Sequence, residues 1–171
     1  MKNKKNSMIF ALLLIVFTAM SCDNNSNTSN DSNNPLVGKF SWNEWKEKAN
    51  WEDYSASDYT PNPTIMQELK KIISNNSKIS FVLFTSNWCP DCKSQMPKTI
   101  KVLLDAGYEI SKLEIYGLDY KKQEPSGAWA KYDIKRVPTL LVFENELEKG
   151  RIIEYPNKSI EEDILDFLIT K

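Results

Sequence analysis

The stretch Trp88-Cys89-Pro90-Asp91-Cys92 decides both the fold and the chemistry of this chain, because two cysteines at this spacing can open and close a disulfide. An apolar run from Ile79 to Phe84 precedes it and predicts a buried strand. The residues from Lys93 to Leu104 predict a helix, so the cysteines lie where a strand gives way to a helix N-terminus. Unpaired backbone N–H groups and the helix dipole favour a thiolate there, and the thiolate is the nucleophile in disulfide exchange. The stretch therefore predicts redox chemistry.

The first 21 residues are typical of a secretory signal peptide. Three lysines are followed by a mostly apolar stretch over residues 8–20, which is too short to span a bilayer, and then by Ser21 and Cys22. A cysteine directly after the cleavage point resembles a bacterial lipoprotein signal, in which Cys22 is lipidated and becomes the first mature residue. The alternative is an ordinary cleaved signal with an incidental free cysteine. Both interpretations place Cys89 and Cys92 outside the cytosol, where disulfides persist.

Three further segments follow the signal peptide. Residues 22–34 hold Cys22 and an Asn/Ser-rich run without apolar residues, which predicts a lipidated, disordered tether. We expect residues 35–63 to form an N-terminal extension packed on the domain, and residues 64–171 to form the domain itself. Signal cleavage removes three lysines and no acidic residue, so the net charge goes from −1 to about −4. No basic patch stands out, and we therefore expect no nucleic-acid partner.

The apolar periodicity gives the order of the elements. It predicts strands at residues 79–85, 113–118, 139–143 and 151–155, and helices at 41–50, 65–74, from 93, at 126–132 and from 159. The last two strands form a hairpin, whose acidic tip from Glu144 to Glu148 is expected in solvent. Strands that alternate with helices and end in a hairpin predict an α/β fold with a central mixed sheet and helices on both faces.

Several separate features resemble the thioredoxin superfamily, over roughly Ile65 to Lys171. Trp88-Cys89-x-x-Cys92-Lys93 corresponds to the active-site motif of that family, and Pro97 stands where thioredoxins kink the following helix. Val137-Pro138-Thr139 looks like the cis-proline loop, which lies beside the disulfide and binds substrate backbone. A cis bond has a modest cost only before proline. The resemblance implies a thioredoxin-like fold and thiol-disulfide oxidoreductase activity.

The resemblance and the local chemistry together give each residue a role. Cys89, at the helix N-cap, is expected to be the exposed attacking thiol, and Cys92, one turn later, the resolving thiol. Trp88 would pack beside the sulfurs, and Pro90 suits the first helical turn, where its missing N–H costs nothing. The motif and substrate-binding set is completed by Asp91, Lys93, Val137 and Pro138. No cofactor is expected beyond the redox-active Cys89–Cys92 disulfide, and no metal, because the chain has no histidine and no second cysteine pair.

Two departures from thioredoxins carry information. Leu83 stands where that family usually holds a buried aspartate that exchanges protons with the second cysteine. The absence of histidine excludes the Cys-x-His-Cys centres of oxidising and isomerising relatives. Asp91 lies between the thiols instead, and its negative charge disfavours a thiolate. Asp91 therefore favours a reductant over a strong oxidant, although the helix N-terminus acts in the opposite direction.

These observations predict an exported lipoprotein, anchored in a membrane and facing the periplasm or the cell exterior, that reduces disulfides in exported proteins. Its expected partners are those disulfide-containing proteins, an unidentified thiol electron donor and, through the lipid anchor, the membrane. The alternative is a non-catalytic surface binding protein that keeps the fold and binds through residues 36–60. The aromatic residues of that segment would then line a ligand surface, whereas helical spacing favours a packing role. They are Trp42, Trp45, Trp51, Tyr54 and Tyr59.

Overall fold

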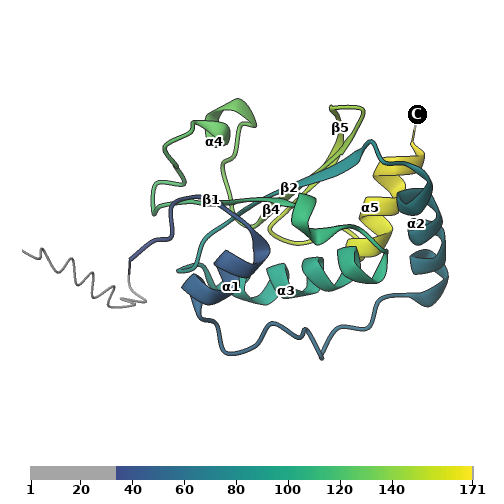
Figure 1. The fold of residues 1–171 in the computed structure, drawn as a ribbon, viewed down its shortest axis with the longest axis horizontal. Helices are drawn as coiled ribbons and strands as arrows, with labels where there is room; N and C mark the ends of the chain where they lie inside the picture. The colour runs from purple at the N-terminus through teal and green to yellow at the C-terminus, as the bar shows by residue number, and fades with distance from the viewer. Residues whose placement is uncertain (1–33, 171) are drawn as a thin grey trace, which may run out of the picture.

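In the computed structural model, which describes residues 34–170, five strands form one mixed sheet in the order β1-β3-β2-β4-β5 (Figure 1). The central strand β2 pairs in parallel with β3 and antiparallel with β4. Strand β1 adds to β3 at one edge and β5 adds to β4 at the other, both antiparallel. The strands are β1 (Gly38–Phe40), β2 (Ile79–Thr85), β3 (Glu114–Gly117), β4 (Thr139–Glu144) and β5 (Leu147–Ile153). This α/β arrangement confirms the fold class predicted from the sequence.

The helices cover the two faces of the sheet unequally. The elements are α1 (Trp42–Ala49), α2 (Pro63–Asn75), α3 (Pro90–Asp105), the 3-10 turn η1 (Ile110–Lys112), α4 (Ala128–Lys131) and α5 (Ile160–Ile169). Helix α4 lies on the opposite side of the sheet from α1 and α3 (Figure 1), and α2 packs against α5 and α3. Within residues 34–170, none of the helices combines the length and the apolar character needed to cross a membrane.

Alternation along β2 explains why this strand is buried on both sides. Phe81 meets the ring of Tyr108, at the end of α3, with 4.8 Å between centroids, and Thr85 reaches Met96 of α3. Phe84 points to the other face, where it stacks on Tyr116 of β3 with the ring planes 14° apart. Because helices cover one side of β2 and aromatic rings pack on the other, apolar residues are needed on both sides. The sequence between residues 79 and 84 is therefore almost continuously apolar.

The N-terminal extension is built into the domain. Ser41 and Glu44 form a capping box that starts α1, and Trp45 of that helix is fully buried. The three-residue strand β1, which the sequence pattern does not predict, brings Leu36 so close to β3 that a Cβ at Gly117 would lie 2.2 Å from the Leu36 carbonyl. Only glycine fits this approach. The tryptophans at positions 42, 45 and 51 are all less than 10% exposed, so they act in packing.

The terminal hairpin is tighter than the sequence pattern predicts. Strand β5 begins at Leu147 instead of residue 151, because Asn145 and Glu146 adopt left-handed φ values of 53° and 66° and close a two-residue turn. Residues 145–147 at the tip are exposed, as predicted, whereas Glu144 and Glu148 at its two ends are half-buried. Glu148 forms a two-pronged ion pair with Arg151, at 2.6 and 2.7 Å.

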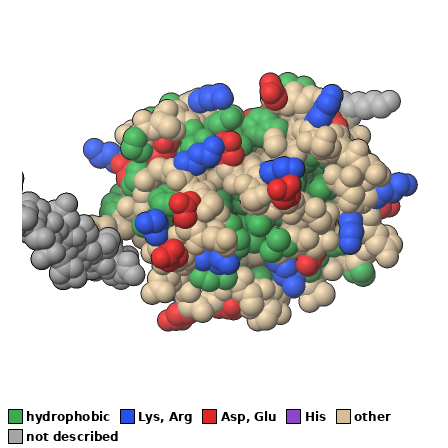
Figure 2. All heavy atoms as spheres, in the orientation of Figure 1, with side chains coloured by type: hydrophobic (Ala, Val, Ile, Leu, Met, Phe, Trp, Pro, Cys, Tyr) green, Lys and Arg blue, Asp and Glu red, His purple; other side chains and the backbone are tan. Residues whose placement is uncertain are grey.

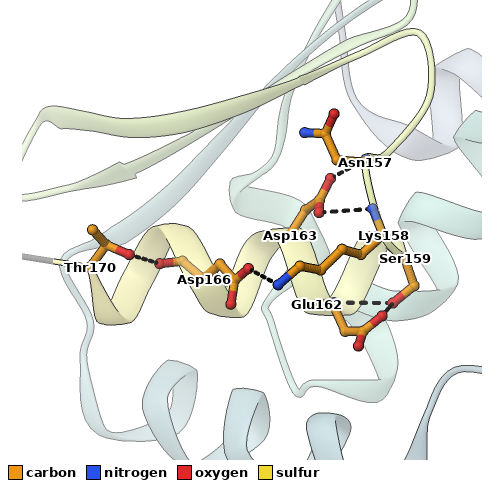
Figure 3. Close-up of polar contacts among 7 residues, drawn as sticks. All are labelled: Asn157, Lys158, Ser159, Glu162, Asp163, Asp166 and Thr170. Carbon is orange, nitrogen blue, oxygen red and sulfur yellow. Dashed lines mark hydrogen bonds and ion pairs between the residues drawn. The ribbon is translucent and has the colours of Figure 1, made fainter.

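The connection from β5 to α5 is fixed by side-chain caps, drawn in Figure 3. Ser159 accepts the backbone N–H of Glu162 and starts α5. Asp163, which is 4% exposed, accepts the backbone N–H groups of Asn157 and Lys158 at 2.6 and 3.2 Å. A buried carboxylate is stable only when its oxygens are hydrogen-bonded, so the loop at residues 155–159 is held in one conformation against α5.

Candidate functional site

The two cysteines lie at the N-terminus of α3, and both are free thiols in this structure. Cys89 is the N-cap, and its sulfur accepts the backbone N–H of Cys92 at 3.4 Å. Pro90 occupies the first helical position, where no N–H is needed, and Asp91 stands in the first turn. The Cys89 sulfur therefore sits where a serine or aspartate side chain caps an ordinary helix.

The two thiols differ in burial and in acidity. Cys89 is 8% exposed, so the prediction of an exposed first thiol is wrong: the helix N-terminus and the cis-proline loop cover most of it. Cys92 is fully buried. A hydrogen bond from the Cys92 thiol, with the backbone N–H groups of Cys92 and Asp91, lowers the pKa of Cys89 to about 6, against burial and the charge of Asp91. Burial and the hydrogen bond to Cys89 raise the pKa of Cys92 far above its usual range. One sulfur is thus a thiolate at neutral pH and the other holds its proton.

The loop before β4 lies directly against the first thiol. The Val137–Pro138 peptide bond is cis, and the Cys89 sulfur lies 3.5 Å from the Val137 carbonyl, to which it donates when it is protonated, across 48 residues of sequence. Thr139 follows as the first residue of β4, and its hydroxyl donates to the Arg136 carbonyl at 2.8 Å. The structure therefore brings the Val137–Pro138 loop next to Cys89, from which it is far away in the sequence.

Trp88 and Lys93 lie on different sides of the motif. The indole N–H of Trp88 donates to the Leu118 carbonyl at 3.1 Å, and its ring lies 5.1 Å from the ring of Tyr120. Trp88 is half-buried, and its side chain is held toward Leu118 and Tyr120. Lys93 is exposed and lines a shallow groove between α3 and the loop that carries Glu52. No residue of the cis-proline loop lines this groove.

Asn87, next to Trp88, is a residue that the sequence does not single out. Its side-chain oxygen accepts the Leu36 N–H at 2.8 Å, and its side-chain nitrogen donates to the Asn34 carbonyl at 3.0 Å. Its backbone carbonyl accepts the indole N–H of Trp51 at 3.3 Å. Three hydrogen bonds therefore join the N-terminal extension to the loop that carries the active-site motif.

Comparison with known proteins identifies this arrangement. The family model described as Thioredoxin matches residues 62–169. The chain belongs to the thioredoxin family. It is 33% identical to thioredoxin of Staphylococcus aureus over 90 residues, which are 53% of this chain and 82% of that protein. It is 29% identical over 102 residues to the thioredoxin-like protein Clot of Arabidopsis thaliana, covering 53% of this chain and 76% of that one.

Solved structures of thioredoxins are also similar to the chain. The thioredoxin of Fasciola hepatica is 26% identical, with a TM-score of 0.38, and the match covers 57% of this chain and 89% of that one. Thioredoxin O2 of Arabidopsis thaliana, in its oxidised state, is 25% identical with a TM-score of 0.33, covering 52% and 76%. The family match and the sequence relatives show that the chain is a thioredoxin-like redox protein.

The environment of Cys92 differs from the thioredoxin pattern. Leu83 is 1% exposed and supplies no polar group where thioredoxins usually hold an aspartate. The hydroxyl of Thr85, two residues closer to the motif on the same face of β2, lowers the pKa of Cys92 against the larger effect of burial. Thr85 is fully buried and also lies 3.6 Å from the sulfur of Met96. Sequence reasoning missed Thr85, although period-two alternation places residues 83 and 85 on one face.

Asp91 has a partner that the sequence does not indicate. The hydroxyl of Tyr155, which follows β5, donates to a carboxylate oxygen of Asp91 at 2.5 Å, across 64 residues. Residues 34–170 contain no cluster of three or more Cys, Asp or Glu side chains that could hold a metal ion. The remaining predicted site residue, Cys22, lies outside the described residues.

Proposed function

We propose that the protein is an exported, membrane-anchored thiol-disulfide oxidoreductase that reduces disulfides in exported proteins. The observation that supports the proposal is that two neighbouring thiols differ in acidity and in burial. Cys89 has a pKa of about 6 and touches the cis-proline loop, while Cys92 is buried one turn behind it. The less buried sulfur, as a thiolate, can attack, and the protonated thiol behind it is held back until the first step is complete.

The reaction has two steps. The Cys89 thiolate attacks one sulfur of the substrate disulfide, a mixed disulfide forms, and the other substrate sulfur leaves as a thiolate that takes up a proton. Cys92 then loses its proton and attacks the Cys89 sulfur, which releases the second substrate thiol. Two electrons pass from the protein to the substrate. The first leaving sulfur takes its proton from solvent, because Cys89 starts as a thiolate, and the second takes the proton that Cys92 gives up. The oxidised pair is restored by an external thiol donor, and no bound cofactor takes part.

Asp91 supports the reductive direction. Its charge raises the pKa of Cys89 against the hydrogen bonds that lower it. A less stabilised thiolate makes the dithiol a better electron donor, because the reduced form is held less strongly. The direction is tested by measuring the reduction potential of the pair in glutathione and dithiothreitol buffers. A potential as high as that of strong oxidants, near −120 mV, would contradict reductase function.

Activity is tested by insulin reduction with the purified full-length protein and dithiothreitol. A rate no higher than that of dithiothreitol alone would exclude the enzyme. The roles of the thiols are tested by trapping: the Cys92→Ser variant should accumulate mixed disulfides through Cys89, whereas Cys89→Ser should not. Equal trapping by both variants would refute the assignment of attacking and resolving thiols.

Export and anchoring rest on the sequence of residues 1–22. We propose that Cys22 is lipidated and that the protein faces the periplasm or the cell exterior. The Cys22→Ala variant should then leave the membrane fraction, and unchanged membrane association would contradict lipidation. On the face shown in Figure 2, basic and acidic side chains are interspersed without a large region of one sign, which supports proteins over nucleic acid as partners.

The alternative, a binding protein that uses residues 36–60, has weaker support. The tryptophans of that segment are buried against the domain and offer little surface to a ligand. Trp51 donates to Asn87 beside the redox motif, so the segment supports the active-site loop. Loss of insulin reduction together with retained partner binding would favour the alternative.

A further inference from the structure

Tyr155 is an exposed tyrosine whose hydroxyl points back to the redox motif. The residue is 54% exposed, yet its hydroxyl donates to Asp91 at 2.5 Å. Asp91 belongs to α3. Tyr155 comes after β5, and the cis-proline loop lies between the two residues in the sequence. The hydrogen bond therefore joins the redox motif to the β5–α5 connection.

The backbone of Tyr155 is fixed relative to the cis-proline loop. Glu154, one residue earlier, has a left-handed φ of 62°, and its N–H donates to the Pro138 carbonyl at 2.7 Å. Its carboxylate pairs with Arg136 at 3.0 Å. Two residues after Tyr155, the hydrogen bonds to Asp163 hold the chain against α5 (Figure 3). Contacts of the residues before and after Tyr155 thus fix the position of its Cα atom, from which the side chain extends.

Asp91 has no comparable restraint of its own. It is a half-buried residue in the first turn of α3, and a short side chain there can rotate toward solvent. The effect of its charge on the Cys89 sulfur falls with distance and with solvent screening. A fixed hydroxyl that binds one carboxylate oxygen therefore decides how strongly this charge acts on Cys89.

We propose that Tyr155 is a positioning residue, which holds the Asp91 carboxylate beside Cys89 and thereby sets how much of the attacking sulfur is thiolate. The proposal deepens, and rests on, the proposed role of Cys89 as attacking thiol. Tyr155 touches neither sulfur in the hydrogen bonds described, and acts through Asp91.

The charged and titratable groups around the site are consistent with this role. Helix α3 contributes Asp91 and Cys92, the cis-proline loop contributes Arg136, and the β5–α5 turn contributes Glu154 and Tyr155. Arg136 and Glu154 pair with each other, so their charges offset at the site. The hydrogen bond to Asp91, and the charge of Cys89, raise the pKa of Tyr155. The hydroxyl therefore stays protonated, as a donor, over the pH range in which Cys89 titrates.

The test is a double-mutant cycle on the reduced full-length protein, read out as the pH midpoint of Cys89 alkylation by iodoacetamide, resolved by peptide mass. The Tyr155→Phe variant releases Asp91, so the midpoint should move to lower pH by roughly half a pH unit. Asp91→Asn should lower it at least as far. In the double variant, Tyr155→Phe should add nothing, because the group that it positions is gone.

Tyr116 supplies a matched control. Its hydroxyl also donates to a carboxylate, that of Glu114, at 3.0 Å, but on β3. Tyr116→Phe should leave the Cys89 midpoint unchanged. An unchanged or raised midpoint in Tyr155→Phe, or shifts that add in the double variant, would overturn the proposal. Alkylation needs no turnover, so a protein that shows these shifts but fails to reduce insulin would refute the proposed function alone.

Discussion

Thr85 offers a direct test of how the buried thiol is activated. Resolution of the mixed disulfide requires negative charge to develop on Cys92, in a site with no exposure to solvent. The Thr85 hydroxyl lowers the pKa of this sulfur, although it donates to Met96 at 3.6 Å and must turn toward Cys92 to stabilise a thiolate; position 83 supplies no carboxylate to help. The Thr85→Val variant removes the hydroxyl while keeping the β-branched shape. We expect the second step to slow, with no effect on the first.

The size of the effect follows from the value of a hydrogen bond to a charged group. Such bonds contribute about 1.5–3 kcal/mol. Losing one from the developing thiolate should slow resolution roughly ten- to hundredfold, at about 1.4 kcal/mol for each tenfold change. Stability should change little, because the partners left behind are weakly polar sulfurs, Met96 and Cys92.

The assay separates the two steps. Reduced protein is mixed with a disulfide peptide, quenched with acid, and the lifetime of the mixed disulfide on Cys89 is followed by mass. Thr99→Val is the control, because that hydroxyl is also on a buried threonine but donates to the Gln95 carbonyl within α3. If Thr85→Val resolves the mixed disulfide as fast as the unmodified protein, the hydroxyl has no part in activating Cys92.

Three further predictions concern acidity and packing. The alkylation rate of Cys89 should rise with pH through about 6 and level off above pH 7, because a lowered pKa leaves the thiolate populated above it; a midpoint near 8.5 would contradict the site geometry. Gly150→Ala should lower the melting temperature, at a cost of about 1–3 kcal/mol, because a Cβ there would lie 2.4 Å from the ring of Phe167. Burial raises the pKa of Glu161, but the hydrogen bonds from Tyr59 and Asn62 together lower it by more, so the pKa lies below its usual value. The link should therefore be intact near neutral pH and be lost as pH falls through this lowered pKa, so the extension should loosen and be cleaved by protease at residues 52–62. Equal cleavage at pH 7 and at an acid pH that titration shows to lie below the pKa of Glu161 would exclude this link.

The sequence predicts the parts of the site that are encoded locally. A strand, a CxxC pair and a helix are adjacent in the chain, so Cys89 at the N-cap follows from residues 79–104 alone. The facing Val137-Pro138 loop was predicted only through resemblance to a family, since nothing local indicates a contact across 48 residues. The helix begins at Pro90 rather than at Lys93, because proline is well tolerated in a first turn.

Long-range partners could not be predicted in this way. Tyr155 and Asp91 meet only because β5 ends beside the start of α3, and neither residue has a pattern that indicates it. Strand β1 is three residues long, too short for period-two alternation to be read, and its pairing depends on close approach at Gly117. The early start of β5 depends on two left-handed residues, Asn145 and Glu146, and only the first is of a type that favours this conformation.

The hydrogen bonds of Asn87 to Asn34 and Leu36 fix the point at which the N-terminal end of the chain joins the domain. The chain enters the described domain at residues 34–36, where Asn87 binds it, one residue from Trp88. If the protein is anchored at Cys22, as proposed, its redox motif lies close to the end of the tether, and the domain itself adds little reach. Residues 22–34 cannot extend beyond about 45 Å. Anchoring there would confine reduction to disulfides within that layer, and lengthening the segment would widen the layer without altering the site.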